Sequence, residues 1–566
     1  MLMTDNLDIQ TPADSTPIWK SRYNHPTDWD QFFEPLSMPG MFFRSAGRRG
    51  EADLLDFMGR KYTYADVAAG VVRVAKGLQD LGVTKGDRIG LFLPNVPHYV
   101  TAYYGAMAIG ATVVNFSPLY TVEELNHQVE DSGTKILFTL SASAVFPTAY
   151  EVLQESSLER LVVGSVAGAL PGAKALFYRL FRRKENSPQP DDKRITRFAD
   201  LTDNDGKFIA PNIHPEKDIA LVQYTGGTTG TPKGAMLSHQ NLTSNARQIN
   251  AIDPFIDDDD RLMGVLPFFH VFANSAVLNR TVQRGGEIVM LPRFDAKQTL
   301  KAITRNRITA MPGVPTMYQA LLDHPDIDKT NFSSLKVCVS GGAPLSVELK
   351  KKFEAKTGAK LVEGYGLTES SGVVSANPYS GLNKSGTIGQ PVPGTLVKLV
   401  DKEDPTKQVP DGDPGELIFS GPQVMQGYWN MPSADEEVFV GGFLRTGDVA
   451  EIDEDGYIKI VDRIKDMIAV GGFKVFPSQV EEVLYQHEAV KEALVIGVPD
   501  DYRGESPRAY VALEEGMGID GETLKDWLNP QLGKHERVTD VVVRDSLPKT
   551  MIGKLDRKTL RAEELG

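Results

Sequence analysis

Two long stretches of the chain alternate between helical and strand-like patterns, and this alternation constrains the fold more than any other feature. It first occupies residues 62–140 and recurs over residues 219–364. In the first stretch, helical and strand-like segments follow one another at 64–81, 88–93, 100–109, 112–115, 123–131 and 135–139. Strands separated by helices imply parallel sheets covered by helices. The sequence therefore predicts an α/β fold.

The pattern changes in the last third of the chain. After about residue 390, short strands are separated by Gly, Asp and Pro, which predicts a smaller, more antiparallel, barrel-like β unit. An Asp-Gly turn within residues 451–458 predicts a hairpin. The rest of the chain reads as a compact α+β unit, and 566 residues exceed one hydrophobic core. We therefore expect an N-terminal domain, a connector and a C-terminal domain at 1–461, 462–465 and 466–566.

Composition and charge argue against several classes of protein. The net charge of −14 gives no overall attraction to nucleic acid. Cys338 is the single cysteine, so no intrachain disulfide is expected, and its valine neighbours predict a buried strand. The nine histidines lack the spacing of a zinc site. Residues 1–20 do not resemble a signal peptide and no long uncharged apolar run occurs, so we expect a cytoplasmic protein.

Residues 224–234 form a loop rich in glycine and threonine, with the sequence Tyr-Thr-Gly-Gly-Thr-Thr-Gly-Thr-Pro-Lys-Gly. It follows an apolar run, residues 219–222, that predicts a buried strand. Glycines let the backbone approach a ligand closely, while hydroxyl groups, backbone N–H groups and Lys233 offer donors and positive charge. The spacing differs from a Walker A loop. A flexible linker is the alternative, but the composition favours polyphosphate binding.

The loop closely resembles the phosphate-binding signature of the adenylate-forming superfamily, which includes acyl-CoA synthetases, luciferases and peptide-synthetase adenylation domains. Similar motifs follow in order at residues 340–344, 363–369, 445–448 and 548–554. The resemblance covers roughly residues 35–562 and is closest to bacterial long-chain fatty acid–CoA ligases. It implies an N-terminal domain of three subdomains, a small mobile C-terminal domain, and ATP, Mg²⁺ and coenzyme A as ligands.

The resemblance also implies roles for individual residues. Lys554 corresponds to the lysine that carries adenylation, and Glu369 and Thr228 correspond to the residues that hold magnesium. Tyr365 corresponds to the aromatic residue on adenine and Asp448 to the acceptor of the ribose hydroxyls. The expected ATP and AMP contacts are Thr225, Gly226, Gly227, Thr228, Thr229, Gly230, Lys233, Gly342, Ala343, Pro344, Gly364, Tyr365, Gly366, Thr368, Asp448 and Arg463.

Three further groups of residues complete the expected site. Phe269, His270 and Val271 lie in an aromatic, apolar segment that borders the acyl pocket in the family. Lys465 matches the hinge position, and Gly471 with Gly472 matches the backbone that lines the pantetheine channel. Two departures, at residues 477–479 and 534–538, put details of the CoA contact in doubt.

The implied activity is ATP-dependent ligation of a long- or medium-chain fatty acid to coenzyme A. An acyl-adenylate is the intermediate, and AMP and pyrophosphate are released. Enzymatic alternatives are a ligase for aryl or dicarboxylic acids, or transfer of the acyl group to a carrier protein. A non-catalytic acyl or nucleotide sensor is a further alternative. It should have lost Lys554 or Glu369, and both are present.

Two charged segments stand apart from these motifs. Residues 174–184 predict a basic amphipathic helix, with Leu176, Phe177, Leu180 and Phe181 on one face. Two interpretations remain open for it: peripheral contact with the inner face of the cell membrane, or packing on its own domain. Four consecutive aspartates, residues 257–260, predict a solvated loop. A homodimer is one candidate for the oligomeric state.

Overall fold

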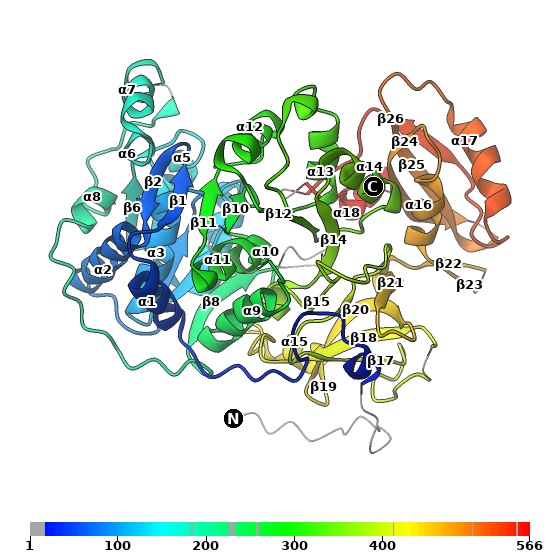
Figure 1. Cartoon of the computed structure of the whole chain (residues 1–566), viewed down its shortest axis with the longest axis horizontal. Coiled ribbons are helices and arrows are strands. Elements are labelled where there is room, and N and C mark those ends of the chain that lie inside the picture. The colour runs from blue at the N-terminus through cyan, green and yellow to red at the C-terminus, as the bar shows by residue number, and fades with distance from the viewer. Residues whose placement is uncertain are drawn as a thin grey trace.

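The fold is described from a computed structural model of the chain. It covers residues 17–182, 185–225, 232–255, 260–410, 412–471, 473–500, 502–550 and 553–565, without the side chain of Arg179. Within these residues the strands form four sheets. Figure 1 shows the two larger sheets at the left and centre with helices around them, the third sheet below, and the C-terminal unit on the right. The predicted fold class is confirmed.

The first sheet has the strand order β7-β6-β5-β3-β4-β8-β9. All its neighbours are parallel except the hairpin of β8 and β9. Its strands are β3 (Arg88–Leu91), β4 (Thr112–Asn115), β5 (Thr134–Leu140), β6 (Arg160–Gly164), β7 (Ile195–Arg197), β8 (Ile219–Tyr224) and β9 (Gly234–Ser238). The associated helices are α2 (Tyr64–Asp80), α3 (Pro97–Ala108), α4 (Val122–Ser132), α5 (Phe146–Glu155), α6 (Val166–Ala169), α7 (Gly172–Phe181) and α8 (Phe198–Leu201).

Local sequence explains why the predicted helices begin where they do. The Thr63 hydroxyl accepts a hydrogen bond from the Asp66 backbone N–H at 3.1 Å, and the Asp66 carboxylate accepts one from the Thr63 N–H at 3.0 Å. This reciprocal capping box satisfies two N–H groups at the start of α2 that lack helical partners. Thr121 and Glu124 form the same arrangement at α4. The helix and strand pattern predicted for 62–140 is therefore confirmed.

The second sheet has the order β16-β15-β14-β13-β12-β10-β11-β1-β2 and is parallel from β14 to β1. Its strands are β1 (Asp53–Phe57), β2 (Arg60–Thr63), β10 (Arg261–Gly264), β11 (Glu287–Met290), β12 (Ala310–Gly313), β13 (Val337–Ser340), β14 (Lys360–Tyr365), β15 (Ser375–Ala376) and β16 (Gln390–Pro391). Its helices are α1 (Met38–Arg49), α9 (His239–Ala251), α10 (Val271–Ala273), the π-helix η3 (Asn274–Asn279), α11 (Arg280–Arg284), α12 (Ala296–Asn306), α13 (Pro315–Leu322) and α14 (Val347–Thr357).

The two large sheets share one hydrophobic core, which includes Cys338 on β13, as predicted. Buried tyrosines on α3 add polar bonds across this core. The Tyr103 hydroxyl donates to the Asn274 amide oxygen at 2.9 Å, and the Tyr104 hydroxyl donates to that of Asn279 at 2.9 Å. Because a buried polar group is costly without a partner, these pairs favour one arrangement of α3 against η3.

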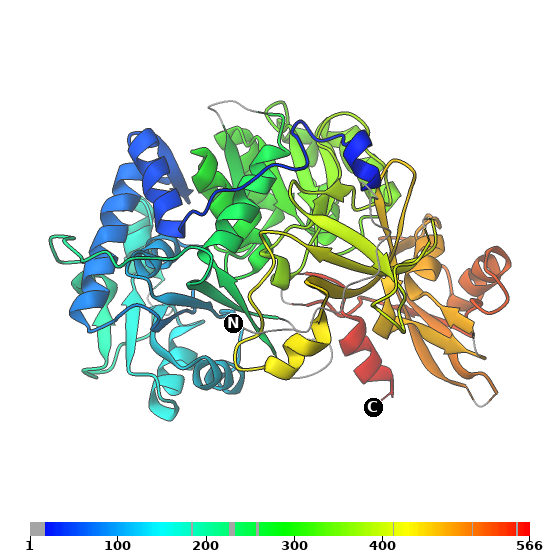
Figure 2. The ribbon, with the colours of Figure 1, turned by 90° about the horizontal axis from the view of Figure 1, so that it is seen from below.

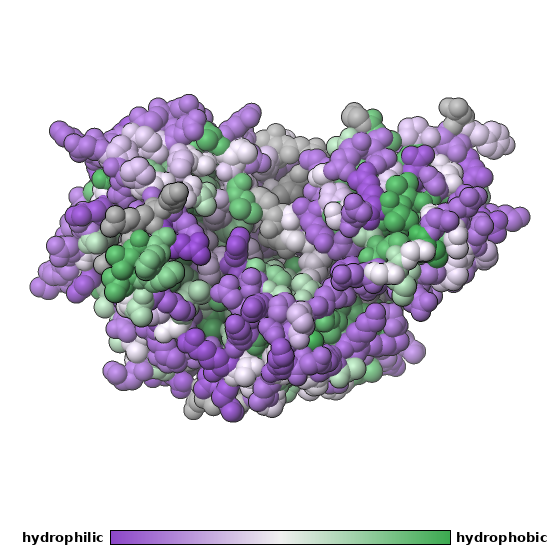
Figure 3. Space-filling view, turned by 90° about the horizontal axis from the view of Figure 1, so that it is seen from above, coloured by the Kyte–Doolittle hydropathy of each residue, from purple (hydrophilic) through white to green (hydrophobic). Residues whose placement is uncertain are grey.

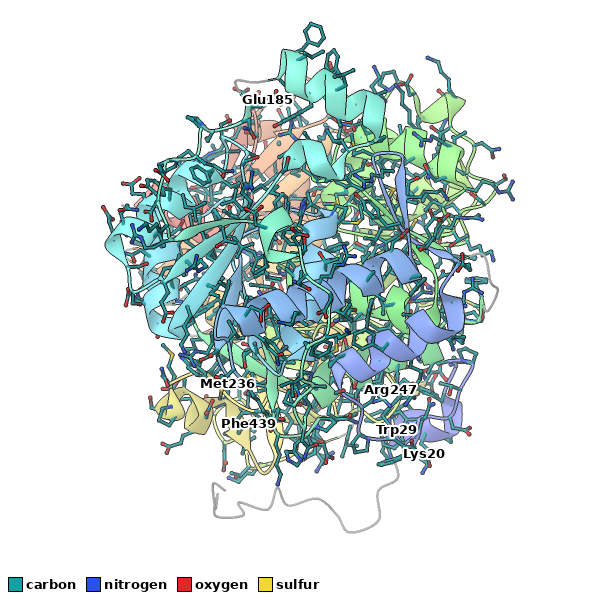
Figure 4. All side chains as sticks on the ribbon, turned by 90° about the vertical axis from the view of Figure 1, so that its left-hand side faces the viewer. Lys20, Trp29, Glu185, Met236, Arg247 and Phe439 are labelled. Carbon is teal, nitrogen blue, oxygen red and sulfur yellow. The ribbon has the colours of Figure 1, made fainter. Side chains whose placement is uncertain are left out.

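Residues 17–37 run across the surface from α1 to the third sheet. The short helix η1 (Ile18–Arg22) lies beside that sheet at one end of the segment (Figures 1 and 2). Trp19 packs so closely on Gly456 that a Cβ there would lie 2.5 Å from the Trp19 Cβ. The indole N–H of Trp29 donates to the Thr395 carbonyl at 3.0 Å. Figure 4 shows Lys20 and Trp29 at the edge of the molecule opposite to Glu185 and α7.

The third sheet is antiparallel and contains the predicted hairpin. Its strands are β17 (Leu396–Val400), β18 (Gly415–Ser420), β19 (Phe439–Val440), β20 (Phe443–Ile452) and β21 (Ile458–Arg463), with α15 (Pro432–Val438) before β19. β20 and β21 are joined through Gly456, whose φ of 77° favours glycine. The register places Asp448 opposite Arg463.

The C-terminal unit has its own sheet and its own cores. β21 ends at Arg463, the short helix η6 (Ile464–Asp466) follows, and β22 begins at Ile468. The other strands are β23 (Phe473–Val475), β24 (Val490–Asp500), β25 (Gly504–Leu513) and β26 (Val541–Arg544), and the helices are α16 (Pro477–Leu484), α17 (Gly521–Leu528) and α18 (Arg557–Leu565). Two apolar clusters within residues 468–560 serve this unit alone. The division at 462–465 into a fixed and a mobile domain stays a prediction.

Candidate active site

A large cavity of about 2550 Å³ lies where the N-terminal sheets meet the C-terminal unit. Its walls include residues that follow the carboxyl ends of the parallel strands β13 and β14, which is where α/β proteins commonly bind ligands. The predicted residues that line it are Thr225, Lys233, Phe269, His270, Val271, Gly342, Ala343, Pro344, Gly364, Tyr365, Gly366, Thr368, Glu369, Asp448, Arg463, Lys465 and Lys554. The structure thus brings together motifs that are hundreds of residues apart.

The other predicted residues are not among those seen to line the cavity. Gly226, Gly227, Thr228, Thr229, Gly230 and Gly472 lie outside the residues that the structure describes. Gly471 is described, in the turn between β22 and β23, and does not line the cavity. The expected contact of Gly471 with coenzyme A therefore has no counterpart in this arrangement.

The ends of the glycine-rich loop are held at the mouth of the β8/β9 hairpin. Tyr224 pairs with Gly234, and the Thr225 N–H donates to the Lys233 carbonyl at 2.9 Å. The Lys233 ammonium lies 5.1 Å from the centre of the Tyr428 ring. This pairing fixes where the chain leaves β8 and where it rejoins the sheet at β9, and both Thr225 and Lys233 line the cavity.

Glu369 is held by a tyrosine that the sequence did not single out. The Tyr428 hydroxyl donates to Glu369 Oε1 at 2.7 Å. Burial, with Glu369 as the second cause, raises the pKa of Tyr428, so the phenol stays a donor at neutral pH. Tyr428 lies in an irregular segment between β18 and α15, where no periodicity marks it.

Two neighbouring strand ends form a narrow glycine-lined wall. Ser340 and Glu363 are paired across β13 and β14, so Gly341–Pro344 and Gly364–Gly366 emerge side by side. A Cβ on Gly366 would lie 1.9 Å from the Gly372 carbonyl oxygen, so no other residue fits there. Glu363 also lines the cavity, and burial raises its pKa to about 8. Glu363 opens the motif at residues 363–369 but is not among the predicted site residues.

Tyr365, Asp448 and Arg463 form a connected polar group on one side of the cavity. The Tyr365 hydroxyl donates to Asp448 Oδ2 at 2.5 Å, and Arg463 Nε lies 2.9 Å from Asp448 Oδ1. Burial, reinforced by Asp448, raises the pKa of Tyr365. A carboxylate offers about four lone-pair positions, so Asp448 retains acceptors for a ligand.

Lys554 reaches the glycine wall from the C-terminal unit. The Lys554 side chain lies directly against Gly342, because a Cβ there would lie 2.4 Å from Lys554 Cε, and the φ of 79° at this position favours glycine. The loop that carries Lys554 closes on itself, because the Thr550 N–H donates to the Lys554 carbonyl at 2.7 Å. The Thr316 hydroxyl, at the start of α13, donates to the Gly553 carbonyl at 2.8 Å.

Electrostatics distinguish Lys554 from an ordinary surface lysine. Burial, together with nearby Arg463, lowers its pKa to about 8. Burial, together with Lys554, lowers the pKa of His270 to about 3, so His270 is neutral at physiological pH. A desolvated ammonium between Gly342 and Arg463 suits a ligand that brings negative charge. Among the described residues, no three His, Cys, Asp or Glu side chains group as a metal site.

Lys465 lies in η6, between the third sheet and the sheet of the C-terminal unit. Burial, followed by the charge of Arg463, lowers its pKa. The connector is anchored on both sides, since the Asp462 carboxylate accepts from the Ser478 N–H at 2.8 Å. These contacts describe one orientation of the two parts.

Comparisons with known proteins agree with this geometry. The AMP-binding enzyme family matches residues 42–429, and the family for the AMP-binding enzyme C-terminal domain matches residues 479–554. A long-chain-fatty-acid–CoA ligase of Bacillus subtilis is 39% identical, covering 96% of this chain and 98% of its own. One from Escherichia coli O6:H1 is 36% identical over 97% of this chain and 98% of its own.

Solved structures of related ligases share the whole fold. ATP-bound MatB from Rhodopseudomonas palustris has a TM-score of 0.82 at 29% identity, covering 93% of this chain and 99% of its own. The anthranilate CoA ligase AuaEII in complex with anthranoyl-AMP has a TM-score of 0.84 at 27% identity, covering 94% and 98%. On the family match and these near-full-length relatives, the chain belongs to the AMP-binding enzyme family.

Proposed function

We propose that this protein is an acyl-CoA synthetase that joins a long- or medium-chain fatty acid to coenzyme A through an acyl-adenylate. The observation that carries the proposal is the half-buried Lys554, which shares one cavity with the Tyr365–Asp448 pair and with apolar residues of the second sheet. Relatives named long-chain-fatty-acid–CoA ligase support a fatty acid as substrate. Structural neighbours that act on anthranilate and benzoate keep the aryl alternative in view.

In the first step, the fatty carboxylate attacks the α-phosphorus of ATP in line and pyrophosphate leaves. The two reactants repel each other because both are negatively charged. Lys554 contacts the carboxylate and the α-phosphate, aligns them and stabilises the charge of the transition state. Asp448 accepts hydrogen bonds from the ribose hydroxyls. The Tyr365 ring packs on adenine, which lies between the two strand ends at Gly342–Pro344 and Gly364–Gly366.

The residues present fit a magnesium ion on the phosphates. Mg²⁺ usually takes one or two protein carboxylates together with substrate phosphates and water, so a full protein cage is not needed. Glu369 is the carboxylate for this role, and its Oε1 is fixed by Tyr428 at 2.7 Å. When bound, the ion neutralises the charge on the leaving pyrophosphate. Thr228 is its proposed second contact.

In the second step, the thiol of coenzyme A attacks the acyl carbonyl carbon and AMP leaves. We place the hinge at Lys465, where a rotation of the C-terminal domain would replace Lys554 by Gly471 and Gly472. Proline at this position would fix φ near about −65°. Lys465→Pro should therefore damage the two half-reactions unequally, measured as pyrophosphate exchange and as thioester formation from prepared acyl-AMP. Equal, mild effects on both would place the hinge elsewhere.

One experiment tests the activity directly. The full chain is incubated with ATP, Mg²⁺, coenzyme A and a panel of fatty, aryl, dicarboxylic and amino acids, and pyrophosphate and thioester are measured. Fatty acids should give both products. Acyl transfer to a carrier protein but not to coenzyme A would favour the carrier alternative. ATP binding without pyrophosphate release from any acid would favour a sensor.

Helix α7 supports a second proposal, peripheral membrane contact. Four of its large apolar side chains, at positions 176, 177, 180 and 181, are 54–71% exposed. This exposure supports membrane contact over packing on its own domain for this face. Figure 3 shows the resulting hydrophobic patch at the left of the molecule, and Figure 4 shows α7 projecting from one end. No helix in the described part of the chain is long and apolar enough to cross a membrane.

The charge of the segment selects the kind of membrane. Lys174 and Arg182 flank the apolar face, and Arg179, Arg183 and Lys184 add positive charge in the sequence. Each basic residue near an anionic bilayer contributes about 1 kcal/mol of attraction. We propose that α7 lies on anionic lipid at the inner face of the cell membrane, which would place the enzyme where fatty acids enter the cytoplasm.

Vesicle sedimentation tests the membrane contact. The protein should sediment with vesicles that contain anionic phosphatidylglycerol, and much less with neutral phosphatidylcholine. Phe177→Ser with Phe181→Ser should abolish this binding, while pyrophosphate release from a water-soluble acid stays intact. Equal sedimentation of wild type and variant would contradict the proposal. A second copy of the chain on this face would appear instead as a dimer that the same variant dissociates.

A further inference from the structure

One branch of the cavity runs along the second sheet, away from Lys554. Leu262, Ala310 and Val337 lie in one row across β10, β12 and β13, because the register pairs them. Pro312 and Val339 form the next row. Alternate residues of a strand share a face, so these rows lead to Gly341 beside the reaction centre. Apart from Gly341, the wall is apolar, and all six residues line the cavity.

The opposite wall is a stripe on the helices that follow His270. Phe272, Ala276 and Arg280 are spaced by four residues, so they follow one side of α10, η3 and α11. A Cβ on Gly341 would lie 3.0 Å from Phe272 Cζ, so Phe272 faces the start of the branch. Arg280, two steps further, therefore faces its far end.

The far end is closed by charged groups. Arg280 is 3% exposed and forms ion pairs with Asp253 and Asp260, and Arg284 lies 3.4 Å from Asp253 Oδ2. Asp260, expected in a solvated acidic loop, is instead buried at 7% exposure because it pairs with Arg280. Tyr379 lines the cavity, and its phenol carries a raised pKa from burial beside this group. We name Arg280, Asp253, Asp260 and Tyr379 the charged floor.

We infer that the charged floor limits the length of the acyl chain that the enzyme accepts, and that it selects medium-chain fatty acids. The inference rests on the proposed function. Four strand residues separate Gly341 from Val337, which is about 13 Å. A zigzag carbon chain advances about 1.3 Å per bond, since each C–C bond is about 1.5 Å, so about ten bonds fill the branch. The terminal methyl of decanoate or dodecanoate then reaches the floor.

A longer chain gains nothing from the floor. Each methylene added along the apolar rows removes apolar surface from water and should raise kcat/KM about fourfold. Beyond the row of Leu262, Ala310 and Val337, the chain meets buried ion pairs. Separating Arg280 from its aspartates would leave buried charges without partners, which is costly. The gain per methylene should therefore stop at the floor and reverse.

The test is a chain-length series with the full-length enzyme, ATP, Mg²⁺ and coenzyme A. Pyrophosphate release is measured with saturated acids from hexanoate to octadecanoate, below their critical micelle concentrations. For the wild type, kcat/KM should peak at decanoate or dodecanoate and fall at least about tenfold by hexadecanoate. A profile that still rises from dodecanoate to octadecanoate would overturn the inference.

Two variants locate the branch and its direction. Ala276 and Ala310 are 7% and 8% exposed and line the cavity, so a leucine at either position extends into the branch. Ala310→Leu, at the deep row, should move the optimum to about octanoate. Ala276→Leu, half-way along, should move it further, to about hexanoate. Retained activity with hexanoate shows that both variants fold.

The control is Ala302→Leu, which adds the same volume outside the cavity. Ala302 is 8% exposed on α12 and should leave the wild-type profile unchanged. An unchanged profile in Ala276→Leu would place the acyl chain elsewhere and overturn the inference. If aryl acids were activated and no fatty acid of any length were, the proposed function would fail, and the chain-length limit with it.

Discussion

The body of the protein, up to Arg463, and the C-terminal unit hold their parts of the site in different ways. In the body, the Tyr365 phenol donates to Asp448 and the Tyr428 phenol donates to Glu369, and both hydrogen bonds are partly buried. Among the residues that the structure describes, the C-terminal unit shares no apolar cluster with the body. Its loop with Lys554 rests on α13 through one hydrogen bond from Thr316, and Lys491 pairs with Asp323 at 2.9 Å.

This difference suggests how the two parts work. A site held by such side-chain hydrogen bonds keeps its geometry before a ligand arrives, which lowers the cost of organising the transition state. A unit held by few polar contacts can leave with little loss of free energy. We therefore expect changes in the body to affect both half-reactions, and changes at the contact with α13 to affect adenylation alone.

The largest effect should come from Lys554→Ala. It removes the ammonium that lies against Gly342, so adenylation should slow about 10²–10³-fold, as when one preorganised donor is deleted. Thioester formation from prepared acyl-AMP should be much less affected. Lys549→Ala is the matched control, because Lys549 stands in the same motif as Lys554, pairs with Glu492 on β24 and does not line the cavity. Equal losses in both half-reactions would break the proposed division.

Glu369→Gln should raise the magnesium concentration needed for pyrophosphate release. Tyr428→Phe removes the hydroxyl that donates to Glu369 and should weaken magnesium affinity about tenfold. Glu369→Gln removes the carboxylate charge itself and should weaken this affinity more. Both are measured from magnesium titrations at fixed ATP. An unchanged magnesium dependence in Glu369→Gln would remove Glu369 from the metal site.

The pH dependence of adenylation should report Lys554. Its pKa is lowered to about 8, and the charged form is the active one, so activity is present below this pH and lost above it. The value of kcat/KM for adenylation should fall about tenfold per unit well above pH 8. This fall above pH 8 should vanish in Lys554→Arg, because the guanidinium keeps its charge there. Its survival there would assign the titration to another group.

Thr316→Val should slow adenylation about two- to tenfold, because the Gly553 carbonyl loses its hydrogen bond. Thr316→Ser keeps the hydroxyl and should restore the rate. Thioester formation should be unchanged or faster, since the contact belongs to one orientation of the C-terminal unit. A parallel loss in that step would mean that Thr316 only stabilises the fold.

The smallest effect should come from the ion pair of Asp323 with Lys491. Both side chains are partly exposed, so Lys491→Gln should change adenylation by a few-fold at most, and less at high salt. Asp323→Lys combined with Lys491→Asp should restore the wild-type rate. If adenylation by the charge-swapped double variant is slower than by either single variant, this ion pair does not hold the C-terminal unit on the body of the protein.

Local patterns were sufficient for much of the fold. The strand expected at 112–115 is observed with the same ends, and the helix expected from Tyr64 ends at Asp80. Both depend on periodicity and on capping residues that lie within a few positions. By contrast, β1 and β2 come from residues 53–63 and join the second sheet beside β11, residues 287–290. No local pattern specifies a partner so distant in the chain.

The site divides in the same way. Lys554, Glu369 and Asp448 stand in recognisable motifs, and the cavity gathers them. The sequence analysis did not select Tyr428, Thr316 or Arg280. These residues lie between the motifs, where no local sequence pattern distinguishes them from other residues of the same type. Their significance comes from what lies opposite them, namely Glu369, Gly553 and the end of the apolar branch.

The sequence by itself determined the elements, the motifs and the chemistry that they carry, because these depend on neighbouring residues. Only the tertiary structure decided that Lys554 lies against Gly342, that α7 turns its apolar face outward, and that the buried Arg280 lines the cavity. The physical reason is that burial and contact are properties of how distant segments pack. A side chain is buried or exposed by its neighbours in space, which a one-dimensional pattern does not contain.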